Sequence, residues 1–528
     1  MCGILAYYNK SGIDRETISN NLKSLKRIKH RGPDDEGVVL LNSKTGFFKT
    51  LKTNETHRDI ACNYNSLFEV EENTFDILLG HRRLSIFDTS SAGHQPMHGR
   101  TGNWIVFNGE IYNFFEIKEE LKTKNYKFIT GTDTEVILAS YLEWGKHCLN
   151  RFNGVWSFVI WDNLKKELFV SNDRFGVKPL YYFQSNTELI LTSEIKQMIP
   201  FDKLKKELIN RKVVDAFLET NYYESNDETL FKSVLRFKPG HYSNINLDFL
   251  RKIIAKKYYF FFESSKIQIS KKDKIEYFRY LFKDAIKIRM RSDVNWGVTI
   301  SGGLDSSAII YFVNQIIKKP INTYSAIFPG KEGDESHHIK RVVEDLGLNA
   351  SFVNPLEKFS MSSLENHIYH QDFPISSTSS YAEWCVANLA HNKGIKIILN
   401  GQGADEVFAG YHHHFYRYCR QLIISGKIRR YLHEINQYSN IKSLNVNNLH
   451  KLILKDLKLV VKFKFGLVKI SSTLAYNWNQ ANTLIKLLEI DFFCSINPIN
   501  LRSDDRNSMA FSVESRHPFM DFRLVEFG

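Results

Sequence analysis

Residues 296–312, WGVTISGGLDSSAIIYF, have the pattern of an apolar strand, a loop of small residues and the start of a helix. The strand ends at Ile300, and the loop runs from Ser301 to Ser307. Small residues let a backbone approach a ligand closely, and a helix N-terminus presents unpaired N–H groups to an anion. The lysine of a Walker A loop is missing, and the acid Asp305 lies inside the loop instead. Because a carboxylate beside phosphates usually implies Mg²⁺, the stretch predicts a phosphate site that uses magnesium.

The sequence around this loop alternates between helices and strands. Helical patterns cover 274–292, 306–319 and 339–347, and short apolar strands cover 296–300, 322–328 and 395–400. Such alternation predicts an α/β domain with a parallel sheet covered on both faces. A second acidic loop, NGQGADE at 400–406, follows the last strand at the same carboxyl edge. We therefore expect Asp405 to join Asp305 on one Mg²⁺. The alternative to a metal ligand is an ordinary carboxylate at a helix N-cap, and this interpretation is stronger for Glu406 than for Asp405.

The N-terminal part has a different texture. Apolar runs with a period near two cover 76–88, 103–114, 157–173 and 180–193, and turn residues separate them. With helical patterns at 118–126 and 133–146, they predict an α+β sandwich. Residues 236–245 are expected to form a hairpin within a connection. We place the N-terminal domain at 2–205, the connection at 206–265 and the C-terminal domain at 266–528.

The composition of the 528 residues, 43% hydrophobic and 24% charged, is that of a soluble globular protein with two or three domains. The start does not resemble a signal peptide, and no window is long and apolar enough to cross a membrane. A cytoplasmic protein without membrane contact is expected. The six cysteines are far apart, which argues against a disulfide framework or a zinc site and favours buried thiols.

The formal net charge of +13 raises the question of a nucleic-acid partner. Much of the excess positive charge lies between 411 and 470, a region with 12 Lys or Arg residues and 2 acidic residues. Because the basic residues alternate there with Leu, Ile and Val, we interpret the region as the solvated outer face of packed helices. A site for RNA or another anionic partner is the alternative.

Cys2 would carry both a thiol and a free α-amine once Met1 is removed, which pairs a nucleophile with a base on one residue. Four motifs follow it: HRGPD at 30–34, HRRLSIFD at 81–88, NGEIYN at 108–113 and GTDTEV at 131–136. Together with Met-Cys-Gly at the start, they resemble the Ntn-type class II glutamine amidotransferase domain. The resemblance implies that Cys2 attacks the side-chain amide of glutamine.

The same resemblance implies roles for the residues in these motifs. The side chain of Asn108 and the backbone N–H of Gly109 would form the oxyanion hole. Arg83 would bind the α-carboxylate of glutamine, and Glu110 and Asp133 its α-ammonium group. The remaining residues would line the pocket or brace it: Leu84, Ser85, Ile86 and Phe87 line it, and Arg31 braces it.

The loop at 301–307 resembles the pyrophosphate loop of the ATP pyrophosphatases, and the chain as a whole resembles the glutamine-hydrolysing asparagine synthetases. This implies an adenine nucleotide alpha hydrolase-like domain that converts aspartate and ATP to β-aspartyl-AMP and pyrophosphate, after which ammonia displaces AMP. The substrates would be glutamine, aspartate and ATP, with no nucleic acid, and a homodimer is left open. Residues 501–521 resemble the C-terminal helical motif of the family. The implied ATP or pyrophosphate contacts are Thr299, Ser301, Gly302, Gly303, Asp305, Ser306, Ser307, Ile327, Asn400 and Gly401.

Two features depart from the family pattern. Gln402 replaces a glutamate that is a plausible base for the incoming ammonia, which leaves the acceptor open. The chain stops at FRLVEFG, before the lysine-containing segment found in family members, so the C-terminal domain is expected to be truncated. Alternatives are therefore amidation of another carboxylate, such as a sugar acid or a peptide, and a synthetase-deficient glutaminase or binding protein. The intact glutaminase motifs argue against a ring-closing β-lactam synthetase.

Overall fold

The computed structural model describes residues 2–61, 64–66, 71, 74–205, 208–221, 226–250, 252–260, 270–332, 334–442, 445–464, 481 and 483–528. The chain forms two compact units. The larger comprises residues 1–210, 227–401 and 501–527, and the smaller comprises 211–226 and 402–500 with Gly528. The domain limits expected from the sequence, at 205 and 265, stay a prediction.

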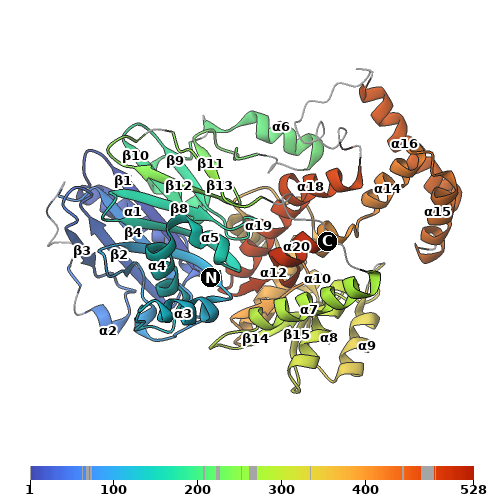
Figure 1. The fold of residues 1–528 in the computed structure, drawn as a ribbon, viewed down its shortest axis with the longest axis horizontal. Coiled ribbons are helices and arrows are strands. Elements are labelled where there is room, and N and C mark those ends of the chain that lie inside the picture. Colours follow the sequence, from blue (N-terminus) through green and yellow to red (C-terminus); the bar gives the residue numbers. More distant parts are fainter. Residues whose placement is uncertain are drawn as a thin grey trace. The chain divides into compact units, whose positions relative to one another are not determined.

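The N-terminal part of the larger unit is a sandwich of two antiparallel sheets, drawn from blue to green in Figure 1. The first sheet has the strand order β11-β9-β10-β1-β4-β2-β3, and the second has the order β13-β12-β8-β7-β6-β5. The strands are β1 (Gly3–Asn9), β2 (Asp35–Leu41), β3 (Phe48–Leu51), β4 (Ile77–Arg83), β5 (Met97–His98), β6 (Trp104–Ile111), β7 (Gly154–Asp162), β8 (Glu167–Asn172), β9 (Tyr181–Gln184), β10 (Glu188–Thr192), β11 (Val234–Arg236), β12 (His241–Asn246) and β13 (Lys256–Lys257).

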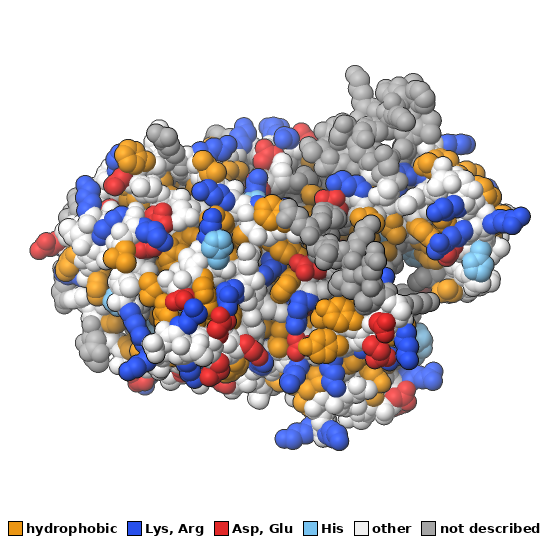
Figure 2. Space-filling model, viewed as in Figure 1, with side chains coloured by type: hydrophobic (Ala, Val, Ile, Leu, Met, Phe, Trp, Pro, Cys, Tyr) orange, Lys and Arg blue, Asp and Glu red, His pale blue; other side chains and the backbone are white. Residues whose placement is uncertain are grey.

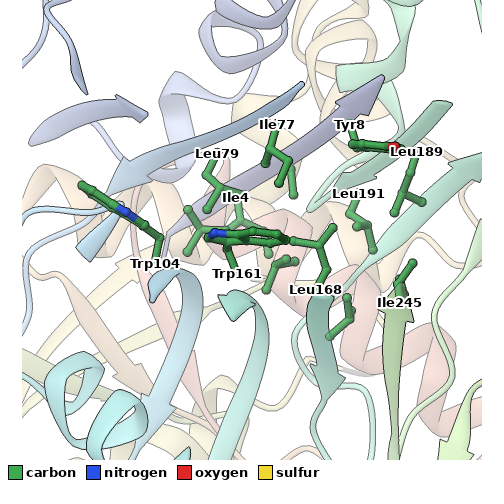
Figure 3. Close-up of a cluster of buried hydrophobic side chains, with 14 of the residues drawn as sticks. Ile4, Tyr8, Ile77, Leu79, Trp104, Trp161, Leu168, Leu189, Leu191 and Ile245 are labelled. Carbon is green, nitrogen blue, oxygen red and sulfur yellow. The ribbon is translucent and has the colours of Figure 1, made fainter. Parts of the chain in front are cut away.

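Alternating side chains of both sheets fill the space between them. Ile4 on β1 and Leu79 on β4 meet Trp161 on β7, and all three are fully buried (Figure 3). The opposite face of β1 buries Leu5 under α1 (Arg15–Lys26). Two further helices, α3 (Phe114–Thr123) and α4 (Asp133–Trp144), pack on one another, and α4 also packs on β6. The period-two pattern thus correctly predicted an α+β sandwich.

The prediction of a hairpin at 236–245 is wrong. Val234–Arg236 pairs with β9 in the first sheet, whereas His241–Asn246 pairs with β8 in the second. Pro239 and Gly240 lie between them, and Gly240 has a φ of +67°. The segment therefore passes from one sheet to the other at a corner of the sandwich, because each strand finds its partner elsewhere in the chain.

The C-terminal part of the larger unit contains a five-stranded sheet in the order β16-β15-β14-β17-β18, and every neighbouring pair is parallel. This confirms the α/β prediction. The strands are β14 (Trp296–Thr299), β15 (Asn322–Ala326), β16 (Asn349–Val353), β17 (Ile397–Leu399) and β18 (Glu514–Arg516). The helices around it include α7 (Lys271–Arg289), α8 (Leu304–Ile316), α9 (Ser336–Leu346), α11 (Met361–Gln371), α12 (Ser379–Asn392) and α19 (Ile496–Met509). The motif at 501–521, expected to be helical, is α-helical only to Met509; it then contributes β18 and a short 3₁₀ helix at Pro518–Met520.

The smaller unit is helical. Its elements are α6 (Arg211–Thr220), α13 (Ala404–Phe408), α14 (His412–Ile424), α15 (Ile428–Lys442), α16 (Val446–Lys464) and α18 (Leu484–Cys494). Helices were expected for 411–470 and are found to Lys464, while 465–470 lie outside the described residues. Arg429 and Arg430 are exposed as expected. On the face of the molecule that Figure 2 shows, basic side chains are interspersed with hydrophobic and uncharged ones. Arg417 and Arg420 depart from this interpretation, since both are buried and donate to the carbonyl oxygen of Ala481.

The cysteines fit the expectation of buried thiols. Cys2, Cys148, Cys385 and Cys419 are buried, and Cys494 is half-buried. No disulfide joins the cysteines that the structure describes, and Cys62 lies outside the described residues. Within the described part of the chain, no helix is both long and apolar enough to span a membrane.

A buried histidine in the sandwich predicts how its stability depends on pH. His81 on β4 contacts the carbonyl oxygen of Phe107 through Nε2 at 3.0 Å, and burial lowers its pKa to about 3. Because this pKa lies below the unfolded value of about 6.5, stability falls as the pH decreases from 6.5. We expect His81→Gln, which keeps an N–H donor, to reduce the loss of unfolding free energy between pH 6.5 and pH 5 by about 2 kcal/mol.

The measurement is urea unfolding of both proteins at the two pH values. Replacement of the exposed His147 by glutamine is the matched control and should leave the pH dependence unchanged. An equal loss of stability in the wild type and His81→Gln would contradict the assignment to His81.

Candidate active site

One pocket in the sandwich collects most of the predicted glutamine-binding residues. Cys2 lies just before β1, Arg83 ends β4, Gly109 and Glu110 lie on β6, and Asp133 begins α4. The pocket wall also contains five residues that sequence analysis missed, so that its full lining is Cys2, Arg83, Leu84, Ile86, Phe87, Gly93, Gln95, Phe107, Gly109, Glu110, Thr132, Asp133 and Thr134. Of the predicted set, Ser85 and Asn108 do not belong to the wall.

Cys2 and Asn108 are in direct contact. The backbone N–H of Cys2 donates to Asn108 Oδ1 at 2.9 Å, and the thiol points at the carbonyl oxygen of Leu84 at 3.9 Å. Asn108 Nδ2 is buried and has no hydrogen-bond partner among the described residues. Burial raises the pKa of the Cys2 thiol, and the nearby Arg83 guanidinium opposes that rise. Asn108 therefore has an unused donor on a side chain that contacts Cys2, and an oxyanion hole requires such a donor.

Gly109 is the position of the second predicted donor. Its φ is +150°, and a Cβ atom there would lie 2.1 Å from the carbonyl oxygen of Val155 on β7. Only glycine fits this approach of β6 to β7 without moving the backbone. The conformation that the predicted N–H donor adopts thus depends on this glycine.

The guanidinium of Arg83 is fixed by the backbone. It donates to the carbonyl oxygens of Ser90 at 2.6 Å and Phe87 at 3.3 Å, and also to that of Asp88. Gly93 packs directly against it, because a Cβ atom on Gly93 would lie 1.8 Å from Arg83 Nη2. In the sequence, Gly93 lies in the turn-like stretch SSAGHQP. This stretch predicts a turn, but it does not reveal that Gly93 packs against Arg83.

We expect Gly93→Ala to raise the KM for glutamine by about 100-fold, since displacing a charge-assisted contact to a carboxylate costs about 1.5–3 kcal/mol. The measurement is glutamate release at varied glutamine concentration. Gly99→Ala is the matched control, because its nearest contact would be an ordinary 3.4 Å from the carbonyl oxygen of Asn103. An unchanged KM in Gly93→Ala would contradict the assignment of Arg83 to substrate binding.

Two carboxyl groups lie in the same pocket. Burial raises the pKa of Glu110 well above its ordinary value, and the charges of Glu514 and Asp133 raise it further. Burial also raises the pKa of Asp133 to about 7, although its Oδ2 accepts from the N–H of Ile111 at 2.9 Å. A cation placed between the two groups would favour their ionised forms. The pair therefore suits a ligand that carries an ammonium group.

Arg31 connects Cys2 to the C-terminal part of the unit. Its Nε donates to the carbonyl oxygen of Cys2 at 3.0 Å, and its Nη1 donates to Glu194 at 2.9 Å. Nη1 and Nη2 also form a two-pronged contact with Asp505 at 2.8 and 3.1 Å. Arg506 Nη1 lies 2.6 Å from the same Glu194 oxygen. These contacts fit the bracing role expected for Arg31.

The predicted phosphate loop lies at the carboxyl end of β14 and leads into α8. Gly303 is the N-cap of α8, and Gly302 has a φ of +83°. Hydrogen bonds within the loop hold its shape, since Ser306 Oγ accepts from the N–H of Ser301 at 3.2 Å and Ser307 Oγ donates to the carbonyl oxygen of Gly303 at 2.7 Å. The helix N-terminus and the loop N–H groups together suit an anion.

The second predicted loop meets the first. Because β14 and β17 are neighbours, Asn400 and Gly401 follow β17 at the edge where the first loop begins. A Cβ atom on Gly401 would lie 3.2 Å from Asp305 Cβ and 3.4 Å from the N–H nitrogen of Ser306. Thr299 ends β14, and Ile327 follows β15 at the same edge. The expected nucleotide contacts of the larger unit are thus brought together.

The acidic residues of the second loop belong to the smaller unit. Asp405 lies on α13, whose N-cap is Gly403, so neither Asp405 nor Glu406 is an N-cap residue. Glu406 is buried and accepts from the Tyr411 hydroxyl at 2.8 Å, which indicates a structural role. The shared Mg²⁺ site of Asp305 and Asp405 stays a prediction.

A second group of potential metal ligands lies in the smaller unit. His413 Nε2 and His414 Nε2 lie 2.7 and 2.9 Å from the same Asp491 oxygen. His414 Nδ1 is buried without a hydrogen-bond partner among the described residues, whereas a metal-bound histidine normally donates its second N–H. Hydrogen bonding between the helices α14 and α18 accounts for this group without a metal.

Comparisons with known proteins agree with both halves of the site. The glutamine amidotransferase domain family matches residues 67–259, and the asparagine synthase family matches residues 277–528. A protein of Methanocaldococcus jannaschii, provisionally named glutamine-hydrolysing asparagine synthetase 2, is 34% identical over 473 residues, which cover 86% of this chain and 83% of the relative.

Two further relatives are more distant. Glutamine-hydrolysing asparagine synthetase 1 of Bacillus subtilis is 30% identical over 417 residues, and the amidase chry2 of Gibberella zeae is 28% identical over 438 residues. Each match covers 78% of this chain and 59% of the relative, so the chain spans little more than half the length of these two proteins. The family matches and the first relative together show that the chain belongs to the glutamine-hydrolysing asparagine synthetase family, whose members are ligases that take glutamine as the amido donor.

Proposed function

We propose that the chain makes L-asparagine from L-aspartate and ATP with ammonia taken from glutamine. The products are AMP, pyrophosphate and glutamate, and the intermediate is β-aspartyl-AMP. The observation that carries the proposal is the pocket lined by Cys2 and by Arg83, whose guanidinium is fixed, together with Asn108, which contacts Cys2 and whose Nδ2 has no hydrogen-bond partner among the described residues.

The glutaminase step uses residues of this pocket. The sulfur of Cys2 attacks the side-chain amide carbon, and the α-amine exposed by removal of Met1 takes the thiol proton and passes it to the departing ammonia. Asn108 Nδ2 and the N–H of Gly109 stabilise the negative oxygen of the tetrahedral intermediate. Arg83 holds the α-carboxylate, and Glu110 and Asp133 hold the α-ammonium group. Water then attacks the thioester carbon and releases glutamate and the thiol.

The synthetase step uses the loops at the edge of the parallel sheet. A β-carboxylate oxygen of aspartate attacks the α-phosphorus of ATP, and pyrophosphate leaves against the N–H groups and hydroxyls of residues 301–307. Ammonia then attacks the acyl carbon and AMP leaves. Asp305 and Asp405 are the residues proposed to hold Mg²⁺, whose chemistry is charge neutralisation on the phosphates.

A different acceptor carboxylate is the second candidate. One observation in its favour is Gln402, because a neutral amide cannot act as the base that an acidic residue at this position would provide. Another is that one relative is named an amidase. The synthetase chemistry would be the same, but a sugar acid or a peptide would replace aspartate.

The test is incubation of the purified chain with glutamine, aspartate, Mg²⁺ and ATP, with glutamate, AMP and asparagine followed by mass spectrometry. We expect asparagine and AMP in equal amounts. AMP formed only with a carboxylate other than aspartate would select the second candidate. Glutamate without AMP for every carboxylate tested would contradict both.

A further inference from the structure

Arg516 touches both halves of the larger unit from a single residue. Its backbone carbonyl accepts from the N–H of Asn400 at 3.0 Å, at the proposed nucleotide site. Its guanidinium extends the other way, and Nη2 lies 3.7 Å from Glu110 Oε2 in the glutamine pocket. The guanidinium carbon also lies 6.0 Å from the ring centre of Phe87, another pocket residue. Arg516 is fully buried, so water does not screen these contacts.

The rest of the guanidinium is firmly anchored. Nε donates to Glu514 at 2.5 Å, and Nη1 donates to the carbonyl oxygens of Arg289 and Arg291 at 2.8 and 2.6 Å. Only the side toward Glu110 is incomplete, because Arg516 Nη2 and Glu110 Oε2 have no hydrogen-bond partner among the described residues. At 3.7 Å the two groups lie beyond the length of a good hydrogen bond. A small movement would close this gap.

The sheet relates this gap to the nucleotide site. Leu399 on β17 is in register with Arg516 on β18, and Asn400 Nδ2 donates to Ser515 Oγ at 2.7 Å. Asn400 is therefore bonded twice to the strand that carries Arg516. A shift of β18 toward Glu110 would move both hydrogen-bond partners of Asn400, and a nucleotide bound at Asn400 would in turn act on β18.

We propose that Arg516 is a positioning residue that couples glutamine binding to nucleotide binding through closure of the contact between Glu110 and Arg516. The inference rests on the proposed function. An ammonium group in the pocket favours the ionised form of Glu110, and the resulting carboxylate attracts Arg516. Burial and the charges of Glu514 and Asp133 raise the pKa of Glu110, which agrees with the open contact between Glu110 and Arg516. Thermodynamic linkage makes this coupling reciprocal: bound glutamine increases the affinity for the nucleotide, and bound nucleotide increases the affinity for glutamine by the same factor.

The test measures binding directly in the full chain carrying Cys2→Ala, which binds glutamine without hydrolysing it. Calorimetry gives the Kd for glutamine with and without saturating Mg²⁺-ATP, and the Kd for ATP with and without glutamine. We expect each Kd to fall by about fivefold or more when the other ligand is present.

The decisive variant adds Glu514→Gln and Arg516→Met together, which removes the ion pair as a unit and leaves no unpaired buried charge between them. Each ligand should still bind alone, and the effect of one on the other should disappear. Arg516→Lys is the second variant, because a lysine lacks the planar guanidinium that contacts several partners at once. It tests the coupling if the double variant does not fold.

Arg291→Lys is the matched control. Arg291 also links the two halves, through Glu116 at 2.5 Å, but that glutamate lies outside the pocket wall. Its replacement should preserve the coupling. Independent binding of the two ligands in Cys2→Ala, or coupling preserved in a folded Arg516 variant, would overturn the inference while leaving the proposed function intact. A chain that binds glutamine but not ATP would contradict the proposed function, and the coupling with it.

Discussion

Replacing Cys2 with alanine should lower glutamine hydrolysis by about 10⁴-fold or more, while asparagine formation from ammonium chloride continues. The thiol is the nucleophile of the proposed reaction, and its loss leaves only the donors of the oxyanion hole. The proposed synthetase residues lie on other elements, at the edge of the parallel sheet, so their chemistry does not need the thiol.

The measurement is glutamate release, with asparagine formation from ammonium chloride as the second readout. Cys148→Ala is the matched control, because Cys148 is a buried thiol outside the pocket wall and should be dispensable for hydrolysis. Loss of both activities in Cys2→Ala, with the fold intact, would contradict a role confined to the glutaminase step.

Replacing Arg31 with methionine should destabilise the protein by about 3–5 kcal/mol, because it leaves the buried carboxylate of Asp505 without its ion-pair partner and removes one partner of Glu194. Arg31 is fully buried and contacts both Glu194 and Asp505. Although burial alone raises the pKa of a carboxyl, the charge of Arg31 lowers that of Asp505 below its ordinary value. The loss of the Nε contact to the carbonyl oxygen of Cys2 should also reduce glutamine hydrolysis.

Urea unfolding measures the first effect. Lys29→Met is the matched control, since Lys29 is half exposed and its contact with Glu55 at 2.6 Å lies at the surface. An exposed pair contributes at most about 1 kcal/mol. Equal destabilisation by the two substitutions would show that the buried network does not contribute as proposed.

Motifs made of consecutive residues could be predicted from the sequence because one strand end or one turn places them. The loop at 301–307 and the end of β17 are such cases, and the structure brings them together at neighbouring strands. Gly93 and Gln95 could not be found in this way, because their position in the pocket depends on contacts with Arg83 and Phe107 from other strands.

Charged side chains caused the other errors. The sequence does not predict the strand β18, because Glu514 and Arg516 do not look like interior residues, yet they are fully buried as a pair. The sequence pattern predicts a solvated position for Arg420, but the side chain is buried and donates to the carbonyl oxygen of Ala481. A sequence pattern assigns charged residues to solvent by default, and only their partners, which lie far away in the chain, reveal the exceptions.

The contact between Arg31 and Asp505 joins residues that are 474 positions apart. During synthesis the N-terminal sandwich emerges first, and N-terminal domains generally fold before the rest of the chain is complete. Arg31 and Glu194 can pair with each other at that stage. The contacts that Arg31 makes with Asp505 and Glu194 makes with Arg506 form only after residues 505 and 506 have been made. The side chain of Arg31, which contacts the carbonyl oxygen of Cys2, consequently gains its full set of partners only when residues 505 and 506 have been added. A partly synthesised chain that lacks them is therefore not expected to carry out the proposed glutamine hydrolysis efficiently.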